Sequence, residues 1–104
     1  MIINNLKYKS KLKDKKIDRL FEAVLKLESE DECYRFFEDL CTVAELKSLA
    51  QRLQVAEMIN KDFSYNSIAE ESGASTATIS RVKKSLNYGA DGYKLVIKKL
   101  SEER

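Results

Sequence analysis

The chain has 104 residues, of which 43% are hydrophobic and 35% are charged. This composition is too apolar for a wholly disordered chain and too charged for a membrane protein, and the length suffices for one domain. The formal net charge is only +2, but residues 1–16 and 75–104 are rich in lysine and arginine on either side of an acidic middle. The two ends can therefore attract phosphate locally.

No apolar stretch is long enough to cross a bilayer, and the N-terminus lacks the apolar segment and cleavage site of a secretory signal. We therefore expect a cytoplasmic protein with no membrane partner. The two cysteines, Cys33 and Cys41, could pair or stay free as small buried hydrophobic residues. Because the chain has no histidine, we expect neither a metal site nor a cofactor.

Helical spacing of the apolar residues dominates the chain, which has no proline and only three glycines. We predict an all-α fold of about six helices. Residues 1–11 are predicted to be a loosely ordered basic arm, residues 12–100 a single domain and residues 101–104 a polar tail. The expected helices lie at about 14–28, from Ser29 to near Leu40, from Thr42 to 60–62, at 65–72, from Ser75 to about 86, and, after a loop at 87–92, from about Tyr93 to Leu100.

Two of these helices are expected to begin with a capping box, in which a hydroxyl and a carboxylate each accept from the other residue's backbone N–H. Ser29 with Glu32 fits the start of the second helix. Thr42 with Glu45 fits the start of the third.

The first three helices carry more large apolar residues than one small core covers. These residues are Phe21, Phe36, Phe37, Leu46, Leu49 and Leu53. We therefore expect a homodimer formed through these helices. A monomeric six-helix bundle fits the same pattern.

Residues 65–84 have the pattern of a helix-turn-helix. This motif needs a small residue where its helices cross, a turn that tolerates positive φ, and apolar residues that face inward. Ala69 fits the crossing and Gly73 fits the turn. The residues expected to face inward are Ile68, Ala74, Ile79 and Val82. Because so many constraints are met in one window, the pattern predicts a DNA-binding unit.

The outward face of the second helix of this motif is small, hydroxylic or basic, and no acid occurs between Glu71 and Asp91. Such side chains suit base edges and phosphates in the major groove. The predicted DNA-contacting residues are Asn66, Ser75, Thr76, Ala77, Ser80, Arg81, Lys83 and Lys84. We predict a homodimeric regulator of transcription, of the repressor kind, that binds specific sequences of double-stranded DNA through residues 75–86.

A protein-interaction module is the alternative, in which the helix-turn-helix docks a partner without direct DNA contact. Binding that weakens steeply with salt would favour DNA, because phosphate contacts release counterions. An enzyme is not expected. The chain has no histidine, its cysteines have no base nearby in the sequence, and no carboxylate cluster lies beside the basic segment.

Three stretches carry a further indication: residues 40–52 (LCTVAELKSLAQR), 73–81 (GASTATISR) and 86–93 (LNYGADGY). They resemble the Trp repressor superfamily, and its YerC/YecD branch of Trp-repressor-like proteins most closely. The resemblance covers about residues 12–100. It implies six helices per subunit and an intertwined two-fold dimer, in which the first three helices and the last form a shared core.

The resemblance also implies an effector pocket, because in this family tryptophan lies between the third helix and the recognition helix, held by an arginine on each. Arg52 and Arg81 match these arginines. The neighbouring pocket positions are matched by Thr42, Thr78 and Ser85. Where the family has glycine after the second arginine, this chain has Val82, whose methyl groups would occupy the ligand's space. L-tryptophan is therefore not expected as an effector, and the sequence identifies no other small molecule.

Overall fold

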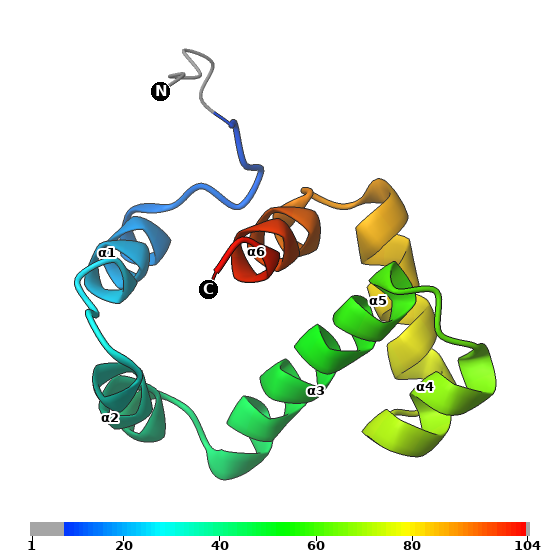
Figure 1. Ribbon diagram of the computed structural model, residues 1–104. Helices are drawn as coiled ribbons and strands as arrows, with labels where there is room; N and C mark the ends of the chain where they lie inside the picture. The colour runs from blue at the N-terminus through cyan, green and yellow to red at the C-terminus, as the bar shows by residue number, and fades with distance from the viewer. Residues whose placement is uncertain (1–7, 104) are drawn as a thin grey trace. The chain divides into compact units, whose positions relative to one another are not determined.

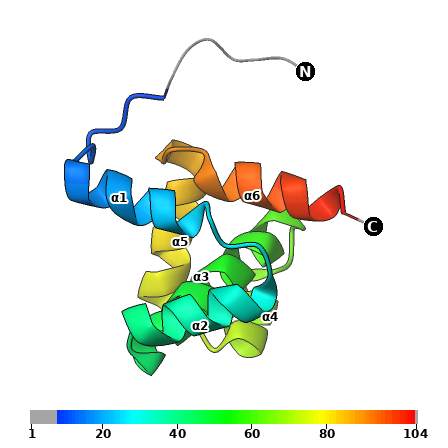
Figure 2. The same ribbon diagram turned by 90° about the vertical axis from the view of Figure 1, so that its left-hand side faces the viewer.

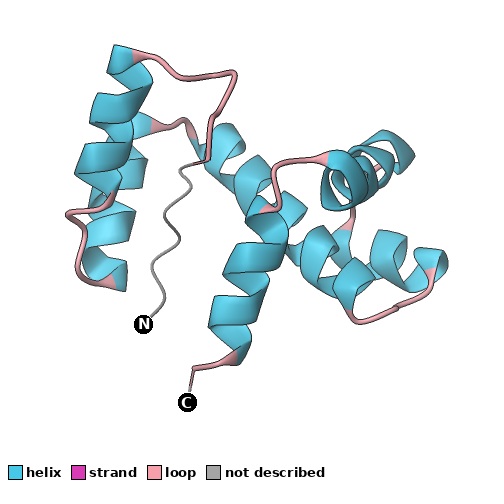
Figure 3. Cartoon of the chain, turned by 90° about the horizontal axis from the view of Figure 1, so that it is seen from above, coloured by secondary structure: helices cyan, strands magenta, loops and turns pink. Residues whose placement is uncertain are grey.

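The computed structural model describes residues 8–103, and this part of the chain forms six α-helices and no strand (Figures 1 and 3). The helices are α1 (Lys15–Val24), α2 (Glu30–Leu40), α3 (Val43–Asn60), α4 (Tyr65–Ser72), α5 (Thr76–Tyr88) and α6 (Gly92–Ser101). The prediction of an all-α fold is confirmed. Residues 1–7 of the predicted basic arm and Arg104 of the predicted tail lie outside the described residues.

The chain separates into two compact units, Met1–Asp39 and Leu40–Arg104. Among the described residues, the closely packed helix pairs all belong to the second unit. There α3 contacts α4, α5 and α6, and α5 also contacts α4 and α6. A single domain over residues 12–100 stays a prediction.

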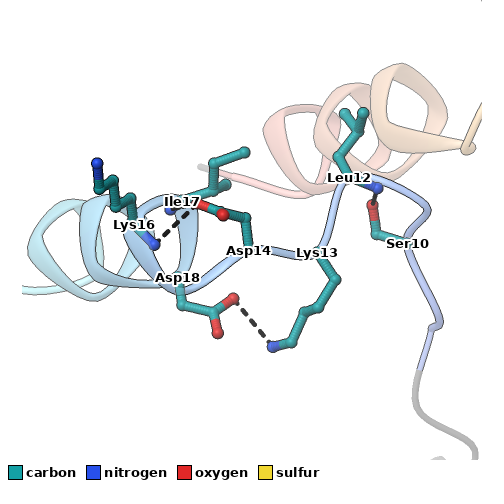
Figure 4. Close-up of polar contacts among 7 residues, drawn as sticks. All are labelled: Ser10, Leu12, Lys13, Asp14, Lys16, Ile17 and Asp18. Atoms are coloured by element: carbon teal, nitrogen blue, oxygen red, sulfur yellow. Dashed lines mark hydrogen bonds and ion pairs between the residues drawn. The ribbon is translucent and has the colours of Figure 1, made fainter.

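In the first unit, α1 begins where a carboxylate accepts from the first free N–H groups of the helix (Figure 4). Asp14 Oδ2 accepts from the backbone N–H of Lys16 at 2.9 Å and from that of Ile17 at 3.1 Å. Lys13 Nζ lies 2.9 Å from Asp18 Oδ1, which adds an ion pair at the same turn. The predicted start near residue 14 therefore has a local cause, an aspartate N-cap.

α1 ends at Val24, earlier than the predicted end near residue 28. The N–H groups of Lys26 and Leu27 donate to carbonyls three residues back, at 3.0 and 3.1 Å, so the chain tightens and leaves the α-helix. The N–H of Glu28 then donates to the carboxylate of Glu32 at 2.8 Å. The spacing of apolar residues predicts a longer helix because Leu27 continues the helical period.

α2 is capped by Ser29, whose Oγ accepts from the N–H of Glu32 at 3.1 Å. The predicted capping box is only half formed, because the Glu32 carboxylate accepts from Glu28 instead of Ser29. Phe36 and Phe37 pack edge to face with ring centroids 5.5 Å apart. Neither α1 nor α2 contains a buried residue, so the described helices of this unit form no core of their own.

The second unit begins with the complete capping box that the sequence predicts. Glu45 N donates to Thr42 Oγ1 at 3.0 Å, and Thr42 N donates to Glu45 Oε1 at 2.9 Å. From this cap α3 runs to Asn60, as expected. A short turn through Asp62, which has a φ of 62°, leads to α4.

The core of the second unit lies between α3, α4 and α5. Its buried residues are Val55, Ala56, Met58, Ile68, Ala74, Ile79, Val82 and Leu86. Tyr93 and Ile97 of α6 pack against this cluster, and α6 crosses α5 (Figure 2). The helix-turn-helix is therefore mounted on α3 by apolar packing.

α5 extends to Tyr88, beyond its predicted end near residue 86, and α6 already begins at Gly92. The loop between them is thus shorter than predicted. Gly89 N donates to the carbonyl of Ser85 at 2.8 Å, and a Cβ at Gly89 would collide with that same carbonyl. Glycine is therefore required for the chain to leave α5 at this angle.

Candidate nucleic-acid interface

α4, the turn after it and α5 form the predicted helix-turn-helix, and each helix has its own serine cap. Ser64 Oγ accepts from the N–H of Ser67 at 3.1 Å, and Ser75 Oγ accepts from that of Thr78 at 3.1 Å. Gly73 between them has a φ of 70° and a ψ of 10°, in the left-handed region. A Cβ there would meet no atom within 4 Å. Glycine is thus favoured by the backbone conformation and not by lack of space.

Side chains of α3 and α4 hold the turn between α4 and α5 in place. Gln51 of α3 donates from Nε2 to the carbonyl of Ser72 at 3.0 Å. The hydroxyl of Ser72 donates to the carbonyl of Ile68 and accepts from the N–H of Ala74, the latter at 3.1 Å. These bonds satisfy backbone groups where α4 ends and fix the direction in which the chain enters α5.

The inner face of α5 is fully apolar and closed to solvent. Ile79 is 4%, Val82 1% and Leu86 7% exposed, and all three belong to the core with Val55 and Ala56 of α3. The predicted inward direction of Ile79 and Val82 is therefore confirmed. Ile68 and Ala74 are also buried as predicted, and Ala69 is half-buried against the same cluster.

The residues that the sequence assigns to DNA contact lie in α4 (Asn66), at the N-cap of α5 (Ser75) and along α5. All of them are exposed: Asn66, Ser75, Thr76, Ala77, Ser80, Arg81, Lys83 and Lys84. The ion pairs of the described residues join Lys13 to Asp18, Arg19 to Glu22 and Arg35 to Asp31, all in the first unit. The three cations of α5 are therefore unpaired in the described part of the chain. DNA contact by these residues stays a prediction.

Two of these side chains already have partners within the protein. Ser75 Oγ caps α5 and also lies 3.1 Å from Thr78 Oγ1. Thr76 Oγ1 lies 3.0 Å from the hydroxyl of Tyr65, the first residue of α4. The sequence reasoning did not select Tyr65, although its place next to Asn66 at the start of α4 was a usable signal. The structure brings this tyrosine to the N-terminal end of α5.

The positions that match the family's effector pocket differ in their surroundings. Arg52 is half-buried, and its buried Nε has no hydrogen-bond partner among the described residues. Thr42 is occupied in capping α3, and Thr78 lies half-buried beside the cap of α5. Arg81 and Ser85 are exposed. Val82, the residue that departs from the family pattern, is one of the least exposed side chains of the core.

Residues 8–103 contain no group of side chains that could hold a metal ion. No described helix has both the length and the apolar character to cross a membrane. Cys33 and Cys41 are both free, and Cys33 is exposed, so the interpretation as a buried hydrophobic residue is wrong for Cys33.

Comparison with known proteins places this geometry in a family. The family model described as Trp repressor protein matches residues 15–101. The uncharacterised protein YerC of Bacillus subtilis (strain 168) is 53% identical over 92 residues, which cover 88% of this chain and 88% of YerC. The resemblance found in the sequence is therefore confirmed over most of the chain.

Two crystal structures resemble the protein closely, each with a TM-score of 0.85. One is a candidate Trp repressor from Staphylococcus aureus, 55% identical, with 89% of this chain and 93% of that chain covered. The other is a TrpR-like protein from Eubacterium eligens ATCC 27750, 52% identical, with 90% and 97% covered. The likeness therefore extends over most of the chain and is not limited to the helix-turn-helix.

Proposed function

The chain belongs to the Trp repressor family, and we propose on this premise that it is a homodimeric transcriptional regulator of the repressor kind. It binds specific sequences of double-stranded DNA, with α5 as the recognition helix. Side chains of α5 contact the base edges, and Asn66 at the start of α4 contacts the backbone or a neighbouring base.

The division of α5 into two faces carries the proposal. One face is buried in the core through Ile79, Val82 and Leu86. The opposite face is exposed and free of acids, and it carries Arg81 and two lysines. A rigidly mounted helix with small, hydroxylic and basic outer residues has the dimensions and chemistry that the major groove accepts. Acidic side chains, which phosphate would repel, are absent from residues 72–90.

Exposed apolar side chains support the homodimer. Phe21 is 57%, Leu40 48% and Leu49 43% exposed, although such residues are usually buried. A second copy of the chain that covers them would pair two recognition helices. A two-fold dimer places such helices in successive major grooves, roughly 34 Å apart.

Selection of bound fragments from a random pool of double-stranded DNA tests this proposal. We expect a palindromic consensus with half-sites about one helical turn, roughly 10 base pairs, apart. If the three cations of each α5 contact phosphate, affinity should fall about a thousandfold between 50 and 200 mM salt. Lys83→Gln should reduce the salt dependence, whereas Lys26→Gln, at an exposed position of the first unit, should not.

Two results would contradict DNA binding. One is a pool without enrichment. The other is binding that does not change with salt, as expected if the helix-turn-helix docks an apolar protein surface. An enriched consensus without palindromic symmetry would retain DNA binding and remove the homodimer.

A further inference from the structure

Tyr65 and Thr76 form a link that the predicted DNA contacts do not explain. Tyr65 is the first residue of α4, and Thr76 is the first residue of α5. Their hydroxyl oxygens lie 3.0 Å apart across a separation of eleven residues, and either can be the donor. Among the described residues this is the side-chain hydrogen bond that joins the two helices of the motif directly.

The link leaves few free hydroxyls at the N-terminal end of α5. Ser75 Oγ accepts from the N–H of Thr78 and donates to its hydroxyl. Thr76 Oγ1 is hydrogen-bonded to the hydroxyl of Tyr65. Because the Oγ1 and the methyl group of threonine share one Cβ, holding the hydroxyl also sets the direction of the methyl group. Tyr65 therefore decides which group Thr76 presents to solvent.

The hydrogen bond between Tyr65 and Thr76 adds too little to the stability of the fold to account for its presence. Tyr65 is 49% exposed, and an exposed hydrogen bond between two hydroxyls adds little to the free energy of unfolding because water competes for both groups. The same bond strengthens when a ligand excludes water, because the local dielectric constant falls. The Tyr65–Thr76 hydrogen bond is therefore strongest when another molecule covers the N-terminal ends of α4 and α5 and excludes water.

We propose that Tyr65 is a specificity-determining residue of the DNA interface, acting as one hydrogen-bonded unit with Thr76. This inference rests on the function proposed above. Tyr65 holds Thr76 in the rotamer that reads one base pair of each half-site, while its own hydroxyl retains capacity for a base edge or an ordered water. A pair of hydroxyl groups brings no cation to the phosphates, so the unit adds discrimination between sequences and not salt-dependent affinity.

A double-mutant cycle tests the unit, with Tyr65→Phe, Thr76→Val and the double variant bound to the selected operator and to scrambled DNA. Each single variant should lower the ratio of operator to scrambled affinity roughly tenfold. The double variant should be no worse than either single one, because both remove the same interaction. Fresh selections should show relaxed preference at the same base pair, and the salt dependence should stay that of the parent protein.

Tyr88→Phe is the matched control, since Tyr88 ends α5, is 83% exposed and has no hydrogen bond to its hydroxyl among those described. It should leave the ratio and the consensus unchanged, and all variants should melt like the parent.

The inference is overturned if Tyr65→Phe keeps the parent's consensus and affinity ratio, or if it weakens every sequence equally. Independent effects that add in the double variant would also overturn the coupled unit. These results leave the proposed function intact when the parent binds its operator. A parent that binds no DNA in a salt-dependent way removes both.

Discussion

The two compact units of this chain place their apolar side chains differently. In residues 40–103 the inward residues of α3, α4 and α5 meet in one core, with Val55, Ala56 and Val82 almost completely enclosed. In α1 and α2 no side chain is buried, and Leu25 is 83% exposed. Aspartate and serine caps and short-range ion pairs define these two helices. Local bonds thus set where α1 and α2 begin, whereas core packing holds α3, α4 and α5 together. Short isolated helices are only marginally stable without such packing.

The largest expected effect comes from breaking the core of the second unit. Ile68→Ala removes buried methyl groups from a side chain that is 3% exposed. It should lower the free energy of unfolding by about 2–5 kcal/mol, and Ile68→Val by about 0.5–1.5 kcal/mol. Urea denaturation measures both. A loss below about 0.5 kcal/mol for Ile68→Ala would mean that the second unit does not depend on this core.

The matching substitution in the first unit is Phe21→Ala, which should weaken formation of the proposed dimer. If the proposed dimer covers Phe21, losing a buried phenylalanine costs about 1.5–3 kcal/mol of association for each copy, so the dimer Kd should rise by about a hundredfold or more. Sedimentation across a range of concentrations measures it. Glu22→Ala, at the adjacent exposed position, should leave the Kd unchanged. An unchanged Kd for Phe21→Ala would place Phe21 outside the interface.

Two arginines, one in each unit, test whether DNA binding depends on where a positive charge lies. Arg81→Ala should weaken binding to the selected operator by about 1–3 kcal/mol, because Arg81 is exposed on the face of α5 proposed to enter the groove and has no ion pair among the described residues. Arg35→Ala removes the same charge from the first unit, where Arg35 Nε already lies 2.8 Å from Asp31 Oδ2. Its effect should be close to zero in DNA titrations at fixed salt. Equal losses for both variants would show that only overall charge matters.

Alanine substitutions at two glycines distinguish the cost of backbone strain from the cost of packing. Gly73→Ala forces a side chain into the left-handed region, at about 1–2 kcal/mol. Gly92→Ala should be nearly neutral, since a Cβ there also meets nothing within 4 Å and the φ of Gly92 is not positive. Thermal melts compare the pair. Equal melting temperatures would show that the turn can relax away from its φ of 70°.

The smallest expected effect is that of L-tryptophan. Val82 is 1% exposed in the core, where the family pattern has glycine, and closely packed sites resist added groups by about 1–3 kcal/mol. Calorimetry with L-tryptophan should show no saturable heat, and operator affinity should not change with it. A clear gain in affinity would overturn this prediction. In that event Val82→Gly should strengthen the response, and Arg52→Ala should abolish it.

Much of the fold could be predicted from short-range patterns. The Thr42–Glu45 capping box, the left-handed Gly73 and the inward side of α5 were all predicted and are confirmed. Helix ends were less accurate. α1 stops at Val24 because the N–H groups of Lys26 and Leu27, just after it, bond to carbonyls three residues back, which apolar spacing does not reveal.

The candidate site divides in the same way. The sequence predicted which side chains of α5 are exposed, because burial of Ile79 and Val82 sets the outer face through the helical period. It did not predict that Thr76 shares its hydroxyl with Tyr65, eleven residues earlier. Such a contact depends on the angle between α4 and α5, and helical spacing does not contain that angle.

The sequence by itself determined the presence of the helices, the cap of α3, the turn and the two faces of α5, because each depends on residues within about one helical turn of one another. Only the tertiary structure decided that the apolar core belongs to residues 40–103 alone, that Gln51 holds the end of α4, and that Tyr65 reaches Thr76. These features depend on how helices distant in sequence pack together. That packing follows from the shapes of all the side chains at the contact.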